Sequence, residues 1–285
     1  MKLVRFGEAG REQPGLIINQ VMYDLSSFDE DFDENFFETD GLERLQIFLK
    51  ESRGSLPRVA EGMRLGSPVA RPSKIVCIGL NYADHARETN AAIPPEPVLF
   101  LKATSSLCGP FDDIIIPKGS KKTDWEVELA VVIEKRASYV DERDAMDHVA
   151  GYCLHNDVSE REFQMERNGT WDKGKGCDTF APLGPWLVTR DEIPDVNKLR
   201  LWLKVNGEMM QDGTTANLIF KVPFLVSYVS QFMTLLPGDV ISTGTPAGVG
   251  LGMKPPVYLK DGDLVELGVD GLGTAKQRCR AYAEN

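Results

Sequence analysis

The stretch DWEVELAVVI, residues 124–133, alternates acidic and apolar side chains and then continues as a run of Ala, Val and Ile. Side chains of a β-strand point alternately to its two faces, so the pattern predicts a strand that carries Glu126 and Glu128 on one face. At about 3.3 Å of rise per residue their backbones are about 7 Å apart, close enough for both side chains to reach one ion. The alternative is that both acids face water at the rim of a sheet.

A third acid follows the next strand-like segment. The run VAGYCLHND ends in Asp157, and loops at the ends of strands present binding groups above a rigid sheet. If the two strands are neighbours, Glu126, Glu128 and Asp157 can bind one hard cation and leave positions open for water or substrate. The chain has only three histidines, so any metal must be held mainly by oxygen. This points to Mg²⁺, Mn²⁺ or Ca²⁺ rather than Zn²⁺ or Cu²⁺.

Other polar groups are candidates for chemistry. In GLNYADHARE, His85 and Glu88 are three residues apart, so on a helix the carboxylate can orient the imidazole as a general base toward water. The alternative is a solvated pair.

Lys175 lies between two glycines, which permit close approach to a ligand, or it is a loop lysine in water. The run TGTPAGVG offers Thr245 and backbone N–H groups to a substrate carboxylate, or it is a plain turn.

The chain divides by composition into two parts. Short strands and an acidic, partly helical segment fill residues 1–52, and the Gly-, Pro- and Ser-rich stretch 53–73 indicates a connection. We therefore predict a small N-terminal α+β domain with its linker at 1–71 and a β-rich main domain at 72–285. Helices are expected around NYADHARE, after DVSE and in VPFLVSYVSQFMTL. Many strands with few helices favour an α+β fold over a regular α/β alternation.

Composition limits the function classes. A net charge of -11 and a pI near 4.9 argue against a nucleic-acid partner. The start MKLVRFGEAG lacks the apolar core of a signal peptide and no apolar run approaches the length of a membrane span, so we expect a cytoplasmic protein with no membrane partner. Five scattered cysteines indicate neither a disulfide framework nor a zinc site. The motifs of serine hydrolases, P-loop proteins and dinucleotide-binding proteins are missing.

Several blocks, in order, resemble the catalytic domain of the fumarylacetoacetate hydrolase family. They are IGLNYADHARE, FLKATSSLCGP, DWEVELAVVI, NDVSEREFQ, GKGCDTFAPLGPW, WLKVNGEMMQ and LLPGDVISTGTPAGVG, and they span about residues 72–285. The resemblance implies a mixed β-roll around a metal site, usually in a homodimer. It implies that Glu126, Glu128 and Asp157 are the metal ligands, with Mg²⁺ as the expected metal and Mn²⁺ as the alternative.

The same resemblance implies roles for the other candidates. His85 and Glu88 match the dyad that activates water, and Lys175 matches the active-site lysine. Substrate contacts are implied for Arg161, Gln164 and Thr245.

The activity implied is hydrolysis of the carbon–carbon bond of a small diketo acid. MKLVRFGE and GTPAGVGLGMKPPVYLKDGD resemble bacterial members named as 2,4-diketo-3-deoxy-L-rhamnonate or L-fuconate hydrolases, or as ureidoglycolate lyases. Oxaloacetate decarboxylation, isomerisation of an unsaturated keto acid and a non-catalytic keto-acid-binding role are the further alternatives. Residues 80–97 combine a short helical pattern with a Pro-rich tail and are expected to form a lid over the substrate.

Overall fold

The computed structural model describes residues 1–52, 54–88 and 92–284. Most strands belong to two sheets, of nine and five strands. In spatial order, the nine-stranded sheet consists of β3 (Val21–Asp24), β2 (Gln13–Ile18), β1 (Lys2–Phe6), β13 (Leu187–Thr189), β10 (Val149–Asn156), β9 (Val127–Ile133), β16 (Val240–Ser242), β4 (Ile75–Gly79) and β5 (Val98–Lys102). The five-stranded sheet consists of β15 (Glu208–Thr214), β14 (Arg200–Val205), β17 (Leu264–Val269), β18 (Gly273–Ala281) and β7 (Ile114–Ile116).

Smaller elements complete the fold. Two short pairs are β8 (Thr123–Asp124) with β11 (Ser159–Glu160), and β6 (Leu107–Cys108) with β12 (Ala181–Pro182). The α-helices are α1 (Glu34–Glu38), α2 (Gly41–Ser52), α3 (Ala83–Glu88), α4 (Arg161–Met165), α5 (Asp172–Lys175) and α6 (Val222–Ser230). Short 3₁₀ turns are η1 (Ser26–Phe28), η2 (Thr104–Ser106), η3 (Ala145–His148), η4 (Arg190–Glu192), η5 (Val196–Lys198), η6 (Thr215–Asn217) and η7 (Gly250–Gly252).

This strand-rich mixture confirms the α+β fold class, and α3, α4 and α6 lie where helices were expected. None of the helices within the described ranges has the length and apolar character of a membrane span. All five cysteines are free thiols, as their spacing indicated.

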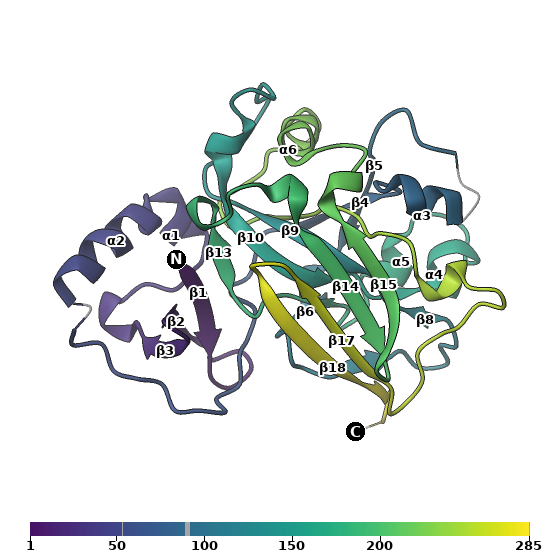
Figure 1. Ribbon diagram of the computed structural model, residues 1–285, viewed down its shortest axis with the longest axis horizontal. Coiled ribbons are helices and arrows are strands. Elements are labelled where there is room, and N and C mark those ends of the chain that lie inside the picture. The colour runs from purple at the N-terminus through teal and green to yellow at the C-terminus, as the bar shows by residue number, and fades with distance from the viewer. Residues whose placement is uncertain (53, 89–91, 285) are drawn as a thin grey trace.

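Strand β9 is buried on both faces because it lies between two hydrophobic cores. Its odd-numbered residues from Val127 to Ile133 share a core with Leu203 and Leu267 of the five-stranded sheet, which Figure 1 shows in front of β9 and β10. Ala130 and Val132, on the other face, share a second core with aromatic residues of the N-terminal segment. Glu128 has the same parity as Ala130, so the acids lie on the face opposite the five-stranded sheet.

The N-terminal segment extends the large sheet. Strand β1 pairs antiparallel with β13, with Leu3 opposite Leu187, and the connection at residues 54–73 forms isolated bridges to β1 and β3. The sheet therefore runs across the predicted boundary near Pro72 (Figure 1). The division of the chain into domains at 1–71 and 72–285 stays a prediction.

The segments that carry the candidate residues lie at one edge of the large sheet. Strands β10, β16 and β4 run in the same direction, because β9 is antiparallel to β10 and β16 while β16 is parallel to β4. The ends of these three strands therefore meet the beginning of β9. The segments that leave this edge include 80–88, 157–175 and 243–252, so residues far apart in sequence converge on one place.

Candidate metal site

Three buried carboxylates lie together at this edge. Strands β9 and β10 are direct neighbours, with His155 opposite Glu128, and the Asp157 N–H donates to the Glu126 carbonyl at 2.9 Å. Glu126, Glu128 and Asp157 each offer an oxygen within 4.8 Å of the others. Their exposed fractions are 5%, 2% and 0%, which excludes the reading in which the two glutamates face water.

Two lysines hold the carboxylates in place. Lys175 Nζ donates to Glu126 Oε2 and to Asp157 Oδ2, both at 2.8 Å. It ends the short helix α5 and is buried, so it is not a loop lysine in water. Lys102, at the end of β5, donates from the other side to Asp157 Oδ1 at 2.5 Å and to the Val158 carbonyl at 3.0 Å. Sequence reasoning missed Lys102, because nothing in its local sequence relates it to a carboxylate 55 positions away.

Burial and charge shift the pKa values of these groups in opposite directions. Burial, together with the charges of Asp157 and Glu126, raises the pKa of Glu128 well above its usual range. Burial opposes ionisation of Asp157 as well, but the charges of Lys102 and Lys175 outweigh it and lower the pKa of this carboxyl. Burial also opposes the charge of Lys175, and Asp157 and Glu126 nevertheless raise its pKa. Asp157 and Lys175 are therefore a charged pair. Glu128 is the carboxylate whose ionised form most requires a neighbouring cation.

Glu128 is held by a second layer of contacts. It accepts hydrogen bonds from the Ser242 hydroxyl and, at 2.9 Å, from the Gly244 N–H. The same hydroxyl lies 2.6 Å from Nδ1 of His155, which is buried beside it. With Glu128 ionised, Ser242 donates to Glu128 and accepts from the Nδ1–H of His155. Burial lowers the pKa of His155 to about 3, so the imidazole is neutral and orients the hydroxyl.

Arg161 joins the triad to a fourth buried acid. Its Nε donates to Asp124 Oδ2 at 2.8 Å, its Nη1 donates to Gln164 Oε1 at 3.1 Å, and its Nη2 lies 2.6 Å from Glu126 Oε1. Asp124 also accepts the N–H groups of Gly250 and Leu251 at 2.7 and 2.9 Å. This carboxylate therefore positions Arg161 and the loop 243–252 together. Sequence reasoning missed Asp124, although it continues the alternation of Glu126 and Glu128.

His85 and Glu88, the predicted water-activating pair, lie next to the carboxylates. Nδ1 of His85 is 3.4 Å from Glu88 Oε2, and the Glu88 oxygens accept the Gly248 N–H at 3.0 and 3.1 Å. Gly248 has φ +106, and a Cβ there would meet the Met210 carbonyl oxygen at 1.9 Å, so this turn requires glycine. Of the predicted lid 80–97, residues 89–91 lie outside the described residues, and the lid stays a prediction.

Several polar groups of the TGTPAGVG turn form hydrogen bonds to other parts of the protein. The Thr245 hydroxyl donates to the Val127 carbonyl at 2.9 Å and accepts from Gln211 Nε2 at 2.8 Å, while the N–H groups of Gly244 and Gly248 bind Glu128 and Glu88. In this structure the turn therefore fixes carboxylates of the chain itself. Gln211, a further residue that sequence reasoning missed, also accepts the Val127 N–H at 2.9 Å. A substrate contact by Thr245 stays a prediction.

All of the predicted site residues except Glu88 and Asp157 line one cavity. Its volume is about 190 Å³, and its lining includes His85, Glu126, Glu128, Arg161, Gln164, Lys175 and Thr245. Glu88 and Asp157 contact residues of that lining. The structure thus brings the predicted groups together at one place.

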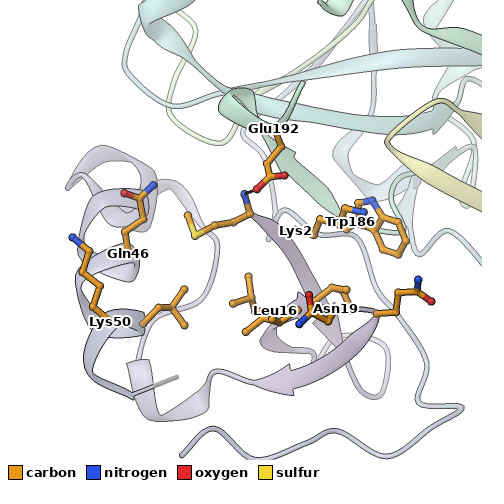
Figure 2. Close-up of a pocket in the computed structure, with 12 residues that line it drawn as sticks. Lys2, Leu16, Asn19, Gln46, Lys50, Trp186 and Glu192 are labelled. Carbon is orange, nitrogen blue, oxygen red and sulfur yellow. Dashed lines mark hydrogen bonds and ion pairs between the residues drawn. The ribbon is translucent and has the colours of Figure 1, made fainter. Parts of the chain in front are cut away.

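A larger cavity of about 1230 Å³ shares no lining residue with the carboxylate cavity. Figure 2 shows it between the N-terminal strands, α2 and the segment with Trp186 and Glu192. Its lining contains one acid, Glu192, whose carboxylate pairs with the amino group of Met1 at 3.2 Å. This cavity is a groove without a cluster of acids.

The carboxylate cavity fits a divalent cation. Its donors are all oxygen, as Mg²⁺ and Mn²⁺ prefer, and they are buried and converge within 4.8 Å. Glu126, Glu128 and Asp157 would hold the ion, and a divalent charge would favour the ionised form of all three.

Comparison with known proteins agrees with this geometry. Residues 74–280 match the family model "Fumarylacetoacetate (FAA) hydrolase C-terminal". A Burkholderia ambifaria protein, named only as a provisional hydrolase, is 55% identical over 98% of this chain and 99% of its own length. The fumarylacetoacetate hydrolase of Exiguobacterium antarcticum is 36% identical, with a TM-score of 0.85 over 99% of this chain and 100% of its own.

Two further structures have more specific names. The maleylpyruvate hydrolase of Sphingobium sp. SYK-6, in complex with manganese(II) and pyruvate, is 28% identical, with a TM-score of 0.82 over 99% of this chain and 100% of its own. The 5-carboxymethyl-2-hydroxymuconate delta-isomerase of Mycobacterium smegmatis is 31% identical, with a TM-score of 0.76 over the whole of both chains. Similar folds thus carry both hydrolases and isomerases.

Proposed function

Since the chain belongs to the fumarylacetoacetate hydrolase family, we propose that it is a divalent-metal-dependent hydrolase of acylpyruvates. Water is added across the carbon–carbon bond between the distal carbonyl and the methylene carbon, which yields a carboxylic acid and pyruvate. The observation that carries the proposal is the convergence of a buried carboxylate triad and a His–Glu pair on one cavity.

Each protein group has a role that its contacts support. A bound Mg²⁺ or Mn²⁺ would supply electrostatic stabilisation for the negative charge that develops on the pyruvyl half. His85, oriented by Glu88, takes a proton from the water that attacks the distal carbonyl. Lys175, buried and charged, stabilises the charge on the departing carbon or delivers its proton. Arg161 and Gln164 line the cavity and contact the substrate.

The finer proposal names the substrate. We favour 2,4-diketo-3-deoxy-L-rhamnonate, or the L-fuconate equivalent, with cleavage of the former to pyruvate and L-lactate. Its support is the resemblance of the N-terminal segment and of residues 244–263 to that subgroup. Ureidoglycolate is the main alternative, but it lacks the 1,3-dicarbonyl arrangement that makes water activation by His85 useful. We also propose a homodimer, as the family resemblance implies, and size-exclusion chromatography with light scattering tests it.

Isomerisation is the second candidate, because one similar structure is named as an isomerase. Release of pyruvate separates the two reactions, because hydrolysis yields pyruvate and isomerisation does not.

The decisive experiment is a coupled pyruvate-release assay across acylpyruvates and diketo sugar acids, with Mg²⁺ or Mn²⁺ and with chelator. We expect metal-dependent release of pyruvate and the matching acid. Conversion of an unsaturated keto acid without release of pyruvate would replace hydrolysis by isomerisation.

A further inference from the structure

The cavity that contains the carboxylates is otherwise mostly apolar. Besides the groups already described, its lining consists of Ile78, Gly79, Leu80, Phe100, Met165, Trp171 and Leu251. Phe100 and Trp171 pack against each other with ring centroids 5.3 Å apart. This wall is suited to hydrocarbon and offers little to a charged group.

The basic side chains of the lining already face carboxylates of the chain. Arg161 contacts Asp124 and Glu126, and Lys175 contacts Glu126 and Asp157. Nδ1 of His85 lies 3.4 Å from Glu88. Residues 89–91, which the structure does not describe, are Thr, Asn and Ala, so they add no positive charge. A second carboxylate on a substrate would therefore meet either apolar atoms or basic groups that are already balanced. A second substrate carboxylate that met only balanced cations or apolar atoms would carry an unbalanced charge, which is costly in a buried place.

The size of the cavity limits the length of the acyl group. Its volume of about 190 Å³ is below the range of about 300 to 1,000 Å³ that is usual for small-molecule pockets. A pyruvyl group with a short tail suits this space better than a long chain with a carboxylate at its far end.

We infer that the site selects acylpyruvates with a short, uncharged acyl tail over acylpyruvates with a second carboxylate, such as maleylpyruvate. This inference rests on the proposed function. The diketo acid derived from L-rhamnonate satisfies it, because its tail is a hydroxyethyl group. The reaction is the same for every tail: water supplies a hydroxyl to the acyl carbon and a proton to the pyruvyl carbon.

The first test compares acetylpyruvate with maleylpyruvate on the Mn²⁺-loaded protein, with kcat and KM measured separately. We expect kcat/KM for acetylpyruvate to be higher by about 10- to 100-fold, the usual effect of leaving one polar group without a partner. Equal or better turnover of maleylpyruvate would overturn the inference and leave the hydrolase assignment intact.

A gain-of-function variant sharpens the test. Met165 lines the cavity, yet its side chain is 61% exposed at the end of α4, so Met165→Arg adds a charge without burying it. The variant should shift the ratio of the two kcat/KM values toward maleylpyruvate by about tenfold. Met209→Arg, at an exposed position of β15 outside the cavity lining, is the matched control and should leave the ratio unchanged. An unchanged ratio in Met165→Arg would contradict the inference.

Binding separates the two proposals if neither compound is turned over. That outcome, together with no release of pyruvate from the diketo sugar acids, would reject acylpyruvate hydrolysis. Calorimetry with the Mn²⁺-loaded protein would then decide the tail preference. Tighter binding of acetylpyruvate would support the inference, and equal or tighter binding of maleylpyruvate would refute it.

Discussion

The two cavities of this protein differ in the property that matters for catalysis. The cavity beside the N-terminal strands has about 1230 Å³, against about 190 Å³ for the one at the end of β9. The charged side chains around the larger cavity, such as Lys50, are exposed or half-buried, and its one acid, Glu192, pairs with the amino group of Met1 (Figure 2). Around the smaller cavity Glu128 and Lys175 are buried, and ion pairs connect the charged groups. Buried, mutually balanced charge identifies the reactive site better than volume does.

The largest effect should come from Glu128, the one carboxylate of the triad that has no lysine contact among the ion pairs of the described residues. Glu128→Gln weakens the hold on a hard cation, since a neutral amide replaces a charged ligand. We expect pyruvate release to fall to the rate of the metal-free protein while the circular dichroism spectrum is kept. Glu134→Gln, just beyond the other end of β9, is the matched control and should retain activity. Full metal-dependent turnover by Glu128→Gln would remove Glu128 from the metal site.

The next effect concerns Asp124, which holds both Arg161 and the loop 243–252. Asp124→Asn leaves the buried guanidinium with one carboxylate fewer, at a cost of about 3 kcal/mol in the free energy of unfolding. Misplacement of Arg161 should lower kcat/KM by about 100-fold. Urea denaturation and steady-state kinetics measure the two effects. A variant with wild-type stability and kinetics would show that Asp124 positions nothing.

A smaller effect is expected from substitution of His155, which contacts the Ser242 hydroxyl that binds Glu128. Loss of the imidazole leaves the Ser242 hydroxyl free to rotate away from the carboxylate. His155→Ala should therefore weaken Mn²⁺ binding by about tenfold, as is usual for groups that orient a metal ligand. Calorimetric titration with Mn²⁺ measures this. His148→Ala, at the opposite end of β10, provides the comparison, and equal affinities in both variants would contradict the orienting role.

The smallest effect should come from the larger cavity. Lys50 is an exposed residue of α2 and lines the N-terminal groove. Lys50→Ala should change neither Mn²⁺ affinity nor kcat/KM by more than about twofold, the range of most surface substitutions. A large loss of activity in this variant would mean that the groove takes part in the reaction and that the contrast between the cavities is misplaced.

Short-range sequence patterns predicted several of the residues that lie together in the structure. The alternation around Glu126 and Glu128 placed both acids on one face, and the end of the next strand supplied Asp157. The pairing of β9 with β10 could not be derived from either strand alone, because register depends on contacts across the sheet.

Long-range partners were beyond sequence reasoning. Lys102 and Asp157 are 55 positions apart, and Ser242 and Glu128 are 114 apart. These contacts depend on the pairing of strands that are distant in sequence, such as β16 with β9, where Ser242 lies opposite Ala130. Asp124 is different, since it belongs to the same alternation as Glu126 and Glu128 and extending that pattern by two residues would have found it.

The most direct test of the central claim is an anomalous difference map from crystals grown with Mn²⁺. The account predicts a strong peak within coordination distance of carboxylate oxygens of Glu126, Glu128 and Asp157, and its loss in crystals of Glu128→Gln. A map without a peak among these three carboxylates, or with its main peak in the groove beside Lys50, would contradict the account.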